Sequence, residues 1–410
     1  MNFIKEGKWA KMNRVNELIK EYCPDGVEIR CLEDCCNLLD KKRKPITKAA
    51  REAGEYPYYG ANGIQDYVAN YIFDGTFVLV GEDGSVITKS GTPVVTWAEG
   101  KIWVNNHAHI IEEKDGVMLR YLYHYLQTID VTSLIHGNIP KLTGGDFKAL
   151  KIAVPPLEVQ REIVHILDSF TLLTAELTAE LTARKKQYEY YRDNILTFDT
   201  TIKHVRLGDI CSVITKGTTP KSYTKTGVSF VKTEAFDGAK IIPNKLSYVD
   251  EETHTTFLKR SMLEENDILI TIAGATIGKC AIVPKEILPA NTNQALAIIR
   301  LAKGNSPKYV MYLLQSDLMK RYMQKNIKGS AQPNLNLKQL NDFIIPLPPL
   351  NVQERLVRVL DNFEAICTDL NIGLPAEIEA RQKQYEYYRD LLLTFAETGS
   401  TLMTDRAERN

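Results

Sequence analysis

A nine-residue segment that occurs twice is the feature that most constrains the fold of this 410-residue chain. It reads KKQYEYYRD at 185–193 and QKQYEYYRD at 382–390, so eight of the nine positions are identical. Repetition of a long, charged and tyrosine-rich segment indicates a duplicated structural unit. We therefore expect two copies of one fold.

The similarity extends over most of both halves of the chain. Three further pairs of segments align, namely VPPLEVQREIVHILDSF (154–170) with LPPLNVQERLVRVLDNF (347–363), YLYHYLQ (121–127) with YVMYLLQ (309–315), and RCLEDCCNLLDKKRKP (30–45) with VRLGDICSVITKGTTP (205–220). The offset between aligned residues grows from 175 to 197 along the chain, so the second copy carries insertions. The repeated unit is roughly 190 residues long.

Each copy has the same predicted order of elements. Runs of β-branched residues between Gly-rich turns predict short strands, as in TFVLVGED (76–83), IWVNNHAHII (102–111) and DILITIAG (267–274). We expect a helix near 117–129, or 307–325, to follow. Pro155-Pro156 and Pro348-Pro349 then mark the starts of long helices, because proline is tolerated in the first turn of a helix but not in its interior.

From Leu157 to Phe198, mostly apolar or aromatic residues recur at spacings of four and three. This pattern predicts a helix about 60 Å long that buries one stripe against a second helix. The second copy has a matching stripe, and Gly373 and Pro375 predict that its helix stops and restarts. The residues expected to pack the helix pair and to dock partners are Leu167, Phe170, Leu177, Leu181, Tyr188, Tyr191, Leu360, Phe363, Tyr385 and Tyr388.

These elements predict a mixed α/β (α+β) fold. Two globular domains with small β-sheets would be joined by two long antiparallel helices in a pseudo-two-fold arrangement.

The chain is 44% apolar and 25% charged, which is ordinary for a globular protein. No apolar run is long enough for a membrane span or a signal peptide, so we expect a cytoplasmic protein. The seven cysteines contain no CxxC pair and are expected to be reduced, buried thiols.

The order of these motifs resembles the specificity subunits of Type I restriction-modification systems, the HsdS family. The resemblance rests on the PPL-containing helix starts, the TAEL tandem at 174–181 and the repeated QYEYYRD, and it covers nearly the whole chain. GVEIRCLEDCC (26–36) and YPYYGANGIQDYV (56–68) are also similar to stretches of the family's target-recognition domains. Family members usually open near MNRVNELIKEYCPDGV, so Met12 is a candidate natural start and residues 1–11 an extension.

The resemblance implies a specificity subunit without catalytic activity. Each globular domain would read one half of a bipartite, asymmetric DNA target, and the helix pair would set the spacer. It further implies two methyltransferase subunits and two restriction or motor subunits as partners. No cofactor is expected in this chain, with S-adenosylmethionine, ATP and Mg²⁺ on the partner subunits.

The expected domains follow from the repeat and the family's layout. They are a first target-recognition domain (1–154) that includes an N-terminal helix at about 12–22, a central helix with the TAEL repeats (155–198), a second target-recognition domain (199–347), a distal helix (348–396) and a flexible tail (397–410).

Because 51 basic residues balance 51 acidic ones, any surface for nucleic acid must be local. The densest basic cluster, KKRK at 41–44, aligns with 216–219, and such side chains suit DNA phosphates. The loops at 138–142 and 330–336 could present amides to adenine. The candidates are Lys41, Lys42, Arg43, Lys44, Lys48, Arg51, Asn138, Lys216, Thr218, Thr219, Lys221, Lys225, Gln332 and Asn334. A solvated basic loop and ordinary turns are the alternative interpretations.

Catalytic and metal motifs are weak. GATIGKC (274–280) lacks the spacing and the Ser or Thr of a phosphate loop and predicts a turn. His107 and His109 could share one face of a strand, but no Cys, Asp or Glu partner stands near them, so we expect packing roles and no metal. The ExK triplet at 112–114 is common by chance. A metal-dependent nuclease and a coiled-coil scaffold without DNA binding remain as alternatives, which Mg²⁺-dependent activity and salt-dependent duplex affinity would distinguish.

Overall fold

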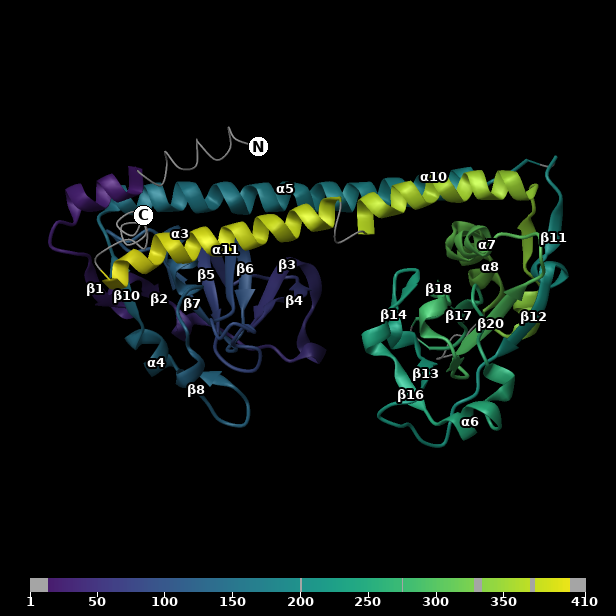
Figure 1. Ribbon diagram of the computed structural model, residues 1–410. Helices are drawn as coiled ribbons and strands as arrows, with labels where there is room; N and C mark the ends of the chain where they lie inside the picture. Colours follow the sequence, from purple (N-terminus) through teal and green to yellow (C-terminus); the bar gives the residue numbers. More distant parts are fainter. Residues whose placement is uncertain (1–13, 200, 275, 328–333, 369–372, 399–410) are drawn as a thin grey trace, which may run out of the picture. The chain divides into compact units, whose positions relative to one another are not determined.

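The computed structural model describes residues 14–199, 201–274, 276–327, 334–368 and 373–398 (Figure 1). The chain divides into two compact units within the helical regions. Unit 1 comprises Met1–Thr178 together with Glu377–Asn410, and unit 2 comprises Ala179–Ala376. The division therefore falls inside the TAEL tandem.

A six-stranded sheet is the centre of unit 1, with the order β2-β7-β5-β6-β3-β4. All neighbours are antiparallel except β3 and β6. A helix at 14–22 precedes the elements β1 (Glu28–Cys31), α2 (Leu32–Cys35), β2 (Asn37–Leu38), β3 (Ala53–Gly60), β4 (Gly63–Val68), β5 (Phe73–Gly81), β6 (Val95–Val104), β7 (Ala108–Glu112), α3 (Leu119–Leu126), β8 (Ile135–His136), β9 (Lys141–Leu142), α4 (Gly144–Ala149) and β10 (Lys151–Val154). The predicted strand at 102–111 is in fact the end of β6 and the start of β7, because a turn at 105–107 interrupts it.

Unit 2 contains a four-stranded sheet with the order β12-β20-β17-β18, a three-stranded sheet β16-β13-β19 and smaller pairs. Its elements are β11 (His204–Arg206), β12 (Cys211–Lys216), β13 (Val228–Val231), β14 (Phe236–Asp237), β15 (Lys240–Ile241), β16 (Ser247–Val249), α6 (Glu251–Thr255), β17 (Ile268–Thr271), β18 (Cys280–Ile282), β19 (Ala290–Thr292), β20 (Leu296–Leu301), α7 (Pro307–Gln315), α8 (Asp317–Asn326), α9 (Leu337–Asp342) and β21 (Ile344–Pro346). The single helix predicted at 307–325 is two helices, α7 and α8.

The two units share one scaffold. The order β2-β7-β5-β6 in unit 1 corresponds to β12-β20-β17-β18 in unit 2, and β1-β10 corresponds to β11-β21. Aligned residues also make the same hydrogen bonds. The Tyr121 hydroxyl donates to the Ala153 carbonyl at 2.8 Å, and the Tyr309 hydroxyl donates to the Pro346 carbonyl at 3.0 Å. Duplication of one unit is therefore visible in the fold as well as in the sequence.

Each unit adds its own elements to this scaffold. Unit 1 extends the sheet with the β3–β4 hairpin, which places β4 at the edge. Unit 2 instead adds the β16-β13-β19 sheet and the β14–β15 pair.

The long helices begin and break where the prolines and the glycine predict. Helix α5 (Leu157–Ile195) follows Pro155-Pro156, and α10 (Leu350–Thr368) follows Pro348-Pro349. A second helix of the distal copy, α11 (Leu374–Thr398), starts after Gly373, whose φ of +96° suits glycine at a helix break. Gln160 fixes one helix start, since its amide donates to the Pro155 carbonyl at 2.7 Å and accepts from the Met118 N–H at 2.9 Å. Gln353 makes the equivalent contacts at the start of α10.

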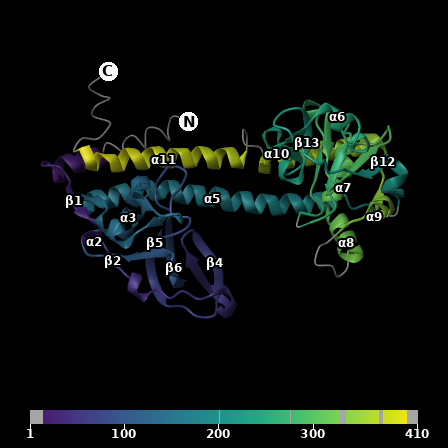
Figure 2. The ribbon, with the colours of Figure 1, turned by 90° about the horizontal axis from the view of Figure 1, so that it is seen from below.

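Each repeat contributes its QYEYYRD segment to the unit that the other repeat builds. In unit 1, α11 runs beside the first part of α5, where the rings of Phe170 and Tyr388 stack at 5.1 Å (Figures 1 and 2). In unit 2, α10 packs on the last part of α5, where Tyr191 and Phe363 stack at 5.9 Å. The apolar stripe is less buried than predicted in the TAEL tandem, where Leu177 and Leu181 are half-buried.

A buried polar clamp holds α11 in unit 1. His124 accepts a hydrogen bond from the Tyr385 hydroxyl at Nδ1, at 2.9 Å, and donates from Nε2 to Asp168 at 2.8 Å. Arg120 also donates to Asp168, at 2.7 Å, and lies 4.6 Å above the Trp97 ring. Burial lowers the pKa of His124 below its ordinary value of 6.5, although the hydrogen bond to Asp168 opposes this shift. His124 is therefore the neutral partner in the clamp.

Aligned residues form the corresponding clamp in unit 2 with different chemistry. Tyr312 aligns with His124 at an offset of 188, and its hydroxyl lies 2.6 Å from Asp361 and 3.0 Å from Glu364. Lys308 takes the place of Arg120 and binds Asp361 at 2.6 Å. Tyr188, which aligns with Tyr385, is left with a buried hydroxyl that has no hydrogen-bond partner among the described residues. The clamp position is thus shared, while its titrating histidine belongs to unit 1 alone.

Acidification should loosen unit 1 selectively. The unfolded chain binds a proton at His124 more readily than the folded unit does, so the stability present above pH 6.5 is lost as the pH falls below it. We expect the amides of α11 to lose protection against hydrogen exchange between about pH 6.5 and 5, after correction for the intrinsic rate. Helix α10 is the internal control, and equal loss of protection in both helices would contradict this account.

Candidate nucleic-acid interface

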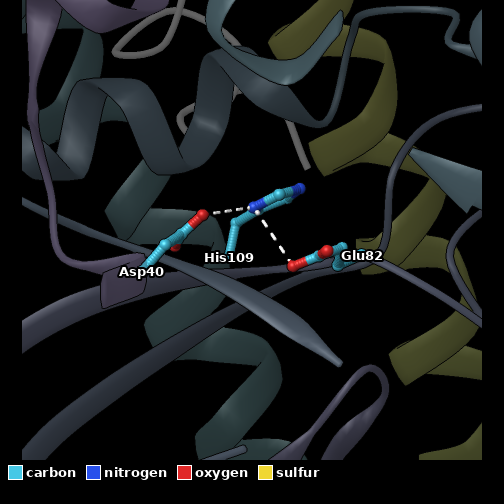
Figure 3. Close-up of side chains that lie close together, drawn as sticks. All are labelled: Asp40, Glu82 and His109. Atoms are coloured by element: carbon cyan, nitrogen blue, oxygen red, sulfur yellow. Dashed lines mark hydrogen bonds and ion pairs between the residues drawn. The ribbon is translucent and has the colours of Figure 1, made fainter. Parts of the chain in front are cut away.

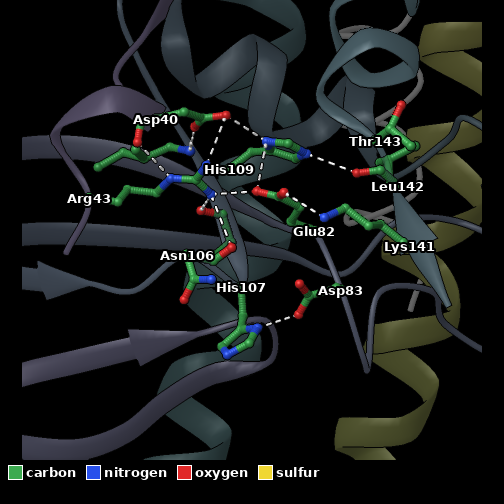
Figure 4. Close-up of polar contacts among 12 residues, drawn as sticks. Asp40, Arg43, Glu82, Asp83, Asn106, His107, His109, Lys141, Leu142 and Thr143 are labelled. Carbon is green, nitrogen blue, oxygen red and sulfur yellow. Dashed lines mark hydrogen bonds and ion pairs between the residues drawn. The ribbon is translucent and has the colours of Figure 1, made fainter. Parts of the chain in front are cut away.

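Two loops predicted from the sequence as DNA contacts meet at one end of the unit 1 sheet. Arg43, from the basic loop after β2, donates to Glu82 at 2.6 Å and to the Ala108 carbonyl at 2.5 Å (Figure 4). Lys141, from the 138–142 loop, binds the other oxygen of Glu82 at 3.3 Å. Glu82 follows the last residue of β5 directly. One carboxylate therefore joins both loops to the sheet.

His109 contacts both of these loops. Its ring is 1% exposed and stacks on Phe147 at 4.3 Å. The Nδ1 atom lies 2.7 Å from Asp40, and the Nε2 atom lies 3.1 Å from the Leu142 carbonyl. Both ring nitrogens therefore face oxygen atoms, one from Asp40 at the start of the basic loop and one from Leu142 at the end of the 138–142 loop.

Asp40 is held as a carboxylate in this cluster. Burial alone would raise its pKa, but the hydrogen bond from His109, the backbone N–H of Ile110 and the charge of Arg43 together hold the pKa below its ordinary value of 3.8. The carboxylate thus anchors the start of the basic loop to strand β7.

Asp40, Glu82 and His109 also have the atom types of a metal site (Figure 3). Their ligand atoms lie within 4.8 Å of one another. The sequence-based expectation that no acidic partner stands near His107 and His109 was wrong, because Asp83 also binds His107. Nor do the two histidines share a strand, since β7 begins after His107.

The protein already satisfies this donor set. Arg43 and Lys141 bring two cations against Glu82, and His109 binds Asp40. A metal ion would have to displace these partners. The arrangement is therefore an ion-pair network that positions loops, and we assign no metal to it.

The six basic candidates of unit 1 fall into two groups. Lys41, Lys42, Lys44 and Lys48 are exposed. Arg43 is only 12% exposed, with its guanidinium engaged by Glu82 and backbone oxygens. Arg51 is 15% exposed, lies 4.1 Å over the Tyr58 ring and binds Asp66 at 3.2 Å. The four lysines are therefore exposed to solvent, whereas the two arginines are engaged in contacts within the protein.

In unit 2 the corresponding loops lie at the equivalent end of the sheet. Lys216 ends β12, and Thr219, Lys221 and Lys225 are exposed after it. Thr218 accepts a hydrogen bond of 3.4 Å from Arg260. Gln332 lies outside the described residues. The ammonium group of Lys232 lies 3.8 Å from the centre of the Tyr223 ring. The sequence did not predict this contact, because the two residues are nine positions apart.

The 138–142 loop and its counterpart occupy matching places. Asn138 and Asn334 are both exposed. The Leu142 N–H donates to the Glu82 carbonyl, and the Leu335 N–H donates to the Ile272 carbonyl, each at 2.8 Å. Ile272 therefore stands where unit 1 has Glu82, so the ion-pair network is specific to unit 1. The described residues between β17 and β18 include the predicted turn, with Gly274 and Gly278 at φ of +90° and +86°.

The repeated helix segments also present exposed aromatic residues. Tyr190 is 65% exposed and its aligned partner Tyr387 is 55% exposed. Of the predicted residues, Leu167, Phe170, Leu360 and Tyr385 are buried. The sequence pattern missed Tyr190 and Tyr387 because they lie off the apolar stripe.

Comparison with known proteins identifies the family. The family described as Type I restriction modification DNA specificity domain matches twice, at residues 24–184 and 200–380. The chain belongs to this family. Its two matches correspond to the two sequence repeats, and each contains one copy of the shared scaffold. This chain therefore carries the specificity domain twice, as the internal repeat predicts. None of the described helices has the length and hydropathy needed to cross a membrane.

Two curated relatives are similar over most of the chain. A type I restriction enzyme specificity subunit from Haemophilus influenzae is 37% identical over 385 residues, which cover 90% of this chain and 96% of the relative. The EcoR124I/EcoR124II specificity subunit of Escherichia coli is 32% identical, covering 69% of this chain and 72% of its own. A chain from a solved structure of type I restriction-modification complex assembly shares the fold, with a TM-score of 0.52, 17% identity and coverage of 91% and 97%.

Removal of the Glu82 charge should destabilise unit 1. In Glu82→Gln, Arg43 and Lys141 lose their shared partner, which should lower the free energy of unfolding by about 1–3 kcal/mol. Tryptophan fluorescence in urea isolates this unit, because the chain has no tryptophan between residues 179 and 376. Asp83→Asn is the matched control. Its partner His107 is 47% exposed, and we expect a loss of about 0–1 kcal/mol. Equal losses of unfolding free energy in both variants would show that the Glu82 network stabilises unit 1 no more than an exposed ion pair does.

Proposed function

We propose that this chain is the DNA-reading subunit of a type I restriction-modification complex and that each unit reads one half of a bipartite target. The supporting observation is that two specificity domains share one scaffold but carry different additions, β3–β4 in unit 1 and β13 to β16 with β19 in unit 2. Different additions predict different half-sites, hence an asymmetric target. Genome-wide mapping of methylated motifs, in a host that expresses the chain with its methyltransferase, tests this proposal. A single undivided motif would overturn it.

The spacer between half-sites would be set by the helices. Helix α5 is unbroken from Leu157 to Ile195 and contributes residues to both units. The number of residues in a continuous helix fixes both the distance and the rotation between its ends. The length of α5 would therefore determine how far apart on the duplex the two domains bind and how they are rotated about it.

Deletion of one TAEL repeat, Thr178–Leu181, should shorten the preferred spacer. Four helical residues span about 6 Å and rotate by about 40° beyond a full turn. One base pair advances the duplex by about 3.4 Å and 36°. We therefore expect a spacer shorter by one or two base pairs and unchanged half-sites, as measured by methylation motifs. Retention of the original spacer would contradict a spacing role for α5.

The duplicated helix segments support a complex with two copies of one partner. Tyr190 and Tyr387 are exposed at aligned positions, so the chain offers the same kind of surface twice. We propose that two methyltransferase subunits bind these surfaces and that two restriction subunits join them, in the cytoplasm.

We further propose that this chain is not an enzyme. Its one cluster of metal-ligand type among the described residues is occupied by Arg43 and Lys141. S-adenosylmethionine, ATP and Mg²⁺ would then bind the partner subunits. Incubation of the isolated chain with DNA and Mg²⁺ should give no cleavage, and cleavage by the isolated chain would overturn the proposal.

Exposed and engaged basic residues should differ in their effect on DNA binding. Lys42→Gln should reduce the slope of log affinity against log salt concentration by about 1, because one phosphate contact is lost. Lys20→Gln, an exposed lysine on the N-terminal helix, is the control and should leave the slope unchanged. The measurement uses the complex with its methyltransferase and a duplex carrying the mapped target. An unchanged slope in Lys42→Gln would show that Lys42 of the basic loop does not contact a DNA phosphate.

A further inference from the structure

Both units carry the same tight turn immediately before the last, in chain order, of the four strands that the two sheets share. In unit 1, the Asn105 side-chain oxygen accepts a hydrogen bond from the His107 N–H at 2.8 Å. In unit 2, the Asn293 side-chain oxygen accepts from the Ala295 N–H at 3.1 Å. The turns lead directly into β7 and into β20, which correspond in the two sheets. The sequences are NNHA at 105–108 and NQAL at 293–296, at an offset of 188.

The backbone confirms that the turns are equivalent. The Glu82 N–H donates to the His107 carbonyl, and the Ile272 N–H donates to the Ala295 carbonyl, each at 2.8 Å. Glu82 and Ile272 also accept from the equivalent residues Leu142 and Leu335. The turns are therefore held at one place in the scaffold, although the surrounding side chains have diverged.

A carboxamide stands at the apex of each turn. Asn106 occupies this position in unit 1 and Gln294 in unit 2, and both are exposed. Neither side chain has a hydrogen-bond partner within the described part of the chain. The turn explains the presence of Asn105 and Asn293, because their side-chain oxygens accept the hydrogen bonds that close it. It does not require a carboxamide at the next position, which Asn106 and Gln294 occupy. The second carboxamide is thus left without a structural role.

The candidate phosphate-binding segment lies against the turn in each unit. Arg43 donates to the Asn106 carbonyl at 3.5 Å (Figure 4), and its neighbours in the sequence, Lys42 and Lys44, are exposed. In unit 2, the Thr218 N–H donates to the Thr292 carbonyl at 2.9 Å, beside the exposed Lys216. In each unit, the turn with the free carboxamide, or the residue just before it, is therefore hydrogen-bonded to a segment that carries exposed lysines.

We propose that Asn106 and Gln294 are equivalent base-reading residues, one for each half of the DNA target, and that each carboxamide reads an adenine edge. The inference rests on the proposed function. An exposed carboxamide offers a donor and an acceptor side by side, which matches N6 and N7 of adenine in the major groove. Adjacent lysines would hold the phosphates that fix its register. Because the turns are equivalent, the two residues contact equivalent positions in the two half-sites.

The test compares Asn106→Ala with Gln294→Ala in the complex with the methyltransferase. Competition binding uses duplexes in which each base pair of the mapped target is changed in turn. Asn106→Ala should lose about 5- to 150-fold of discrimination at one adenine of one half-site, the range of a bidentate contact. Gln294→Ala should do so at one adenine of the other half-site. Asn106→Gln keeps the amide and should retain part of the discrimination.

Matched controls separate base reading from general damage. Asn70→Ala and Gln324→Ala remove exposed carboxamides elsewhere in unit 1 and unit 2 and should leave both half-sites unchanged. Unaltered thermal unfolding confirms that the variants fold, as expected for exposed positions. Loss of discrimination at both half-sites in one variant, a uniform fall in affinity for every duplex, or no change would each overturn the inference. If the wild-type complex recognises no bipartite target, the proposed function fails first and the inference falls with it.

Discussion

The structure depends on the burial of a repeated helix segment against the domain built by the other repeat. Tyr385, from the second repeat, is buried in unit 1 against His124, and Tyr188, from the first repeat, packs in unit 2 beside Tyr312. Helix α5 is too long and its exposed middle too polar to be held by its own repeat alone. The exchange means that neither repeat completes its own unit, so the two repeats depend on each other for their folded domains.

This coupling leaves the rest of each domain free to diverge. Both units keep the same frame, with equivalent hydrogen bonds. It consists of the four shared strands, the two-stranded pair β1–β10 or β11–β21, and the glutamine at the start of each long helix. The two units differ in the side chains that anchor the loops at the end of this frame. Unit 1 anchors its loops with Asp40, Glu82 and His109, whereas unit 2 has Ile272 at the place of Glu82. A buried charge network in one copy and an apolar contact in the other serve the same geometric purpose.

Much of the fold could be predicted because its signals are local. Proline pairs open helices, Gly373 interrupts one, and the repeated motifs align residue by residue. The same local reasoning failed at residues 102–111, where an Asn-closed turn divides an apparent strand, and at 307–325, where two helices replace one. In the candidate interface it also gave equal weight to six basic residues, although Arg43 and Arg51 are engaged within the protein. Their partners, Glu82 and Asp66, are 39 and 15 residues away.

The amino-acid sequence by itself determined the duplication, the order of domains and helices, and the family, because these follow from the spacing of residues along the chain. Only the tertiary structure decided which repeat's helix packs on which domain, which basic residues remain free and which loops converge at the end of each sheet. These outcomes depend on strand order and on contacts between distant residues. Neither is encoded in any single stretch of sequence, because a side chain's partner is set by the sheet that brings the two segments together.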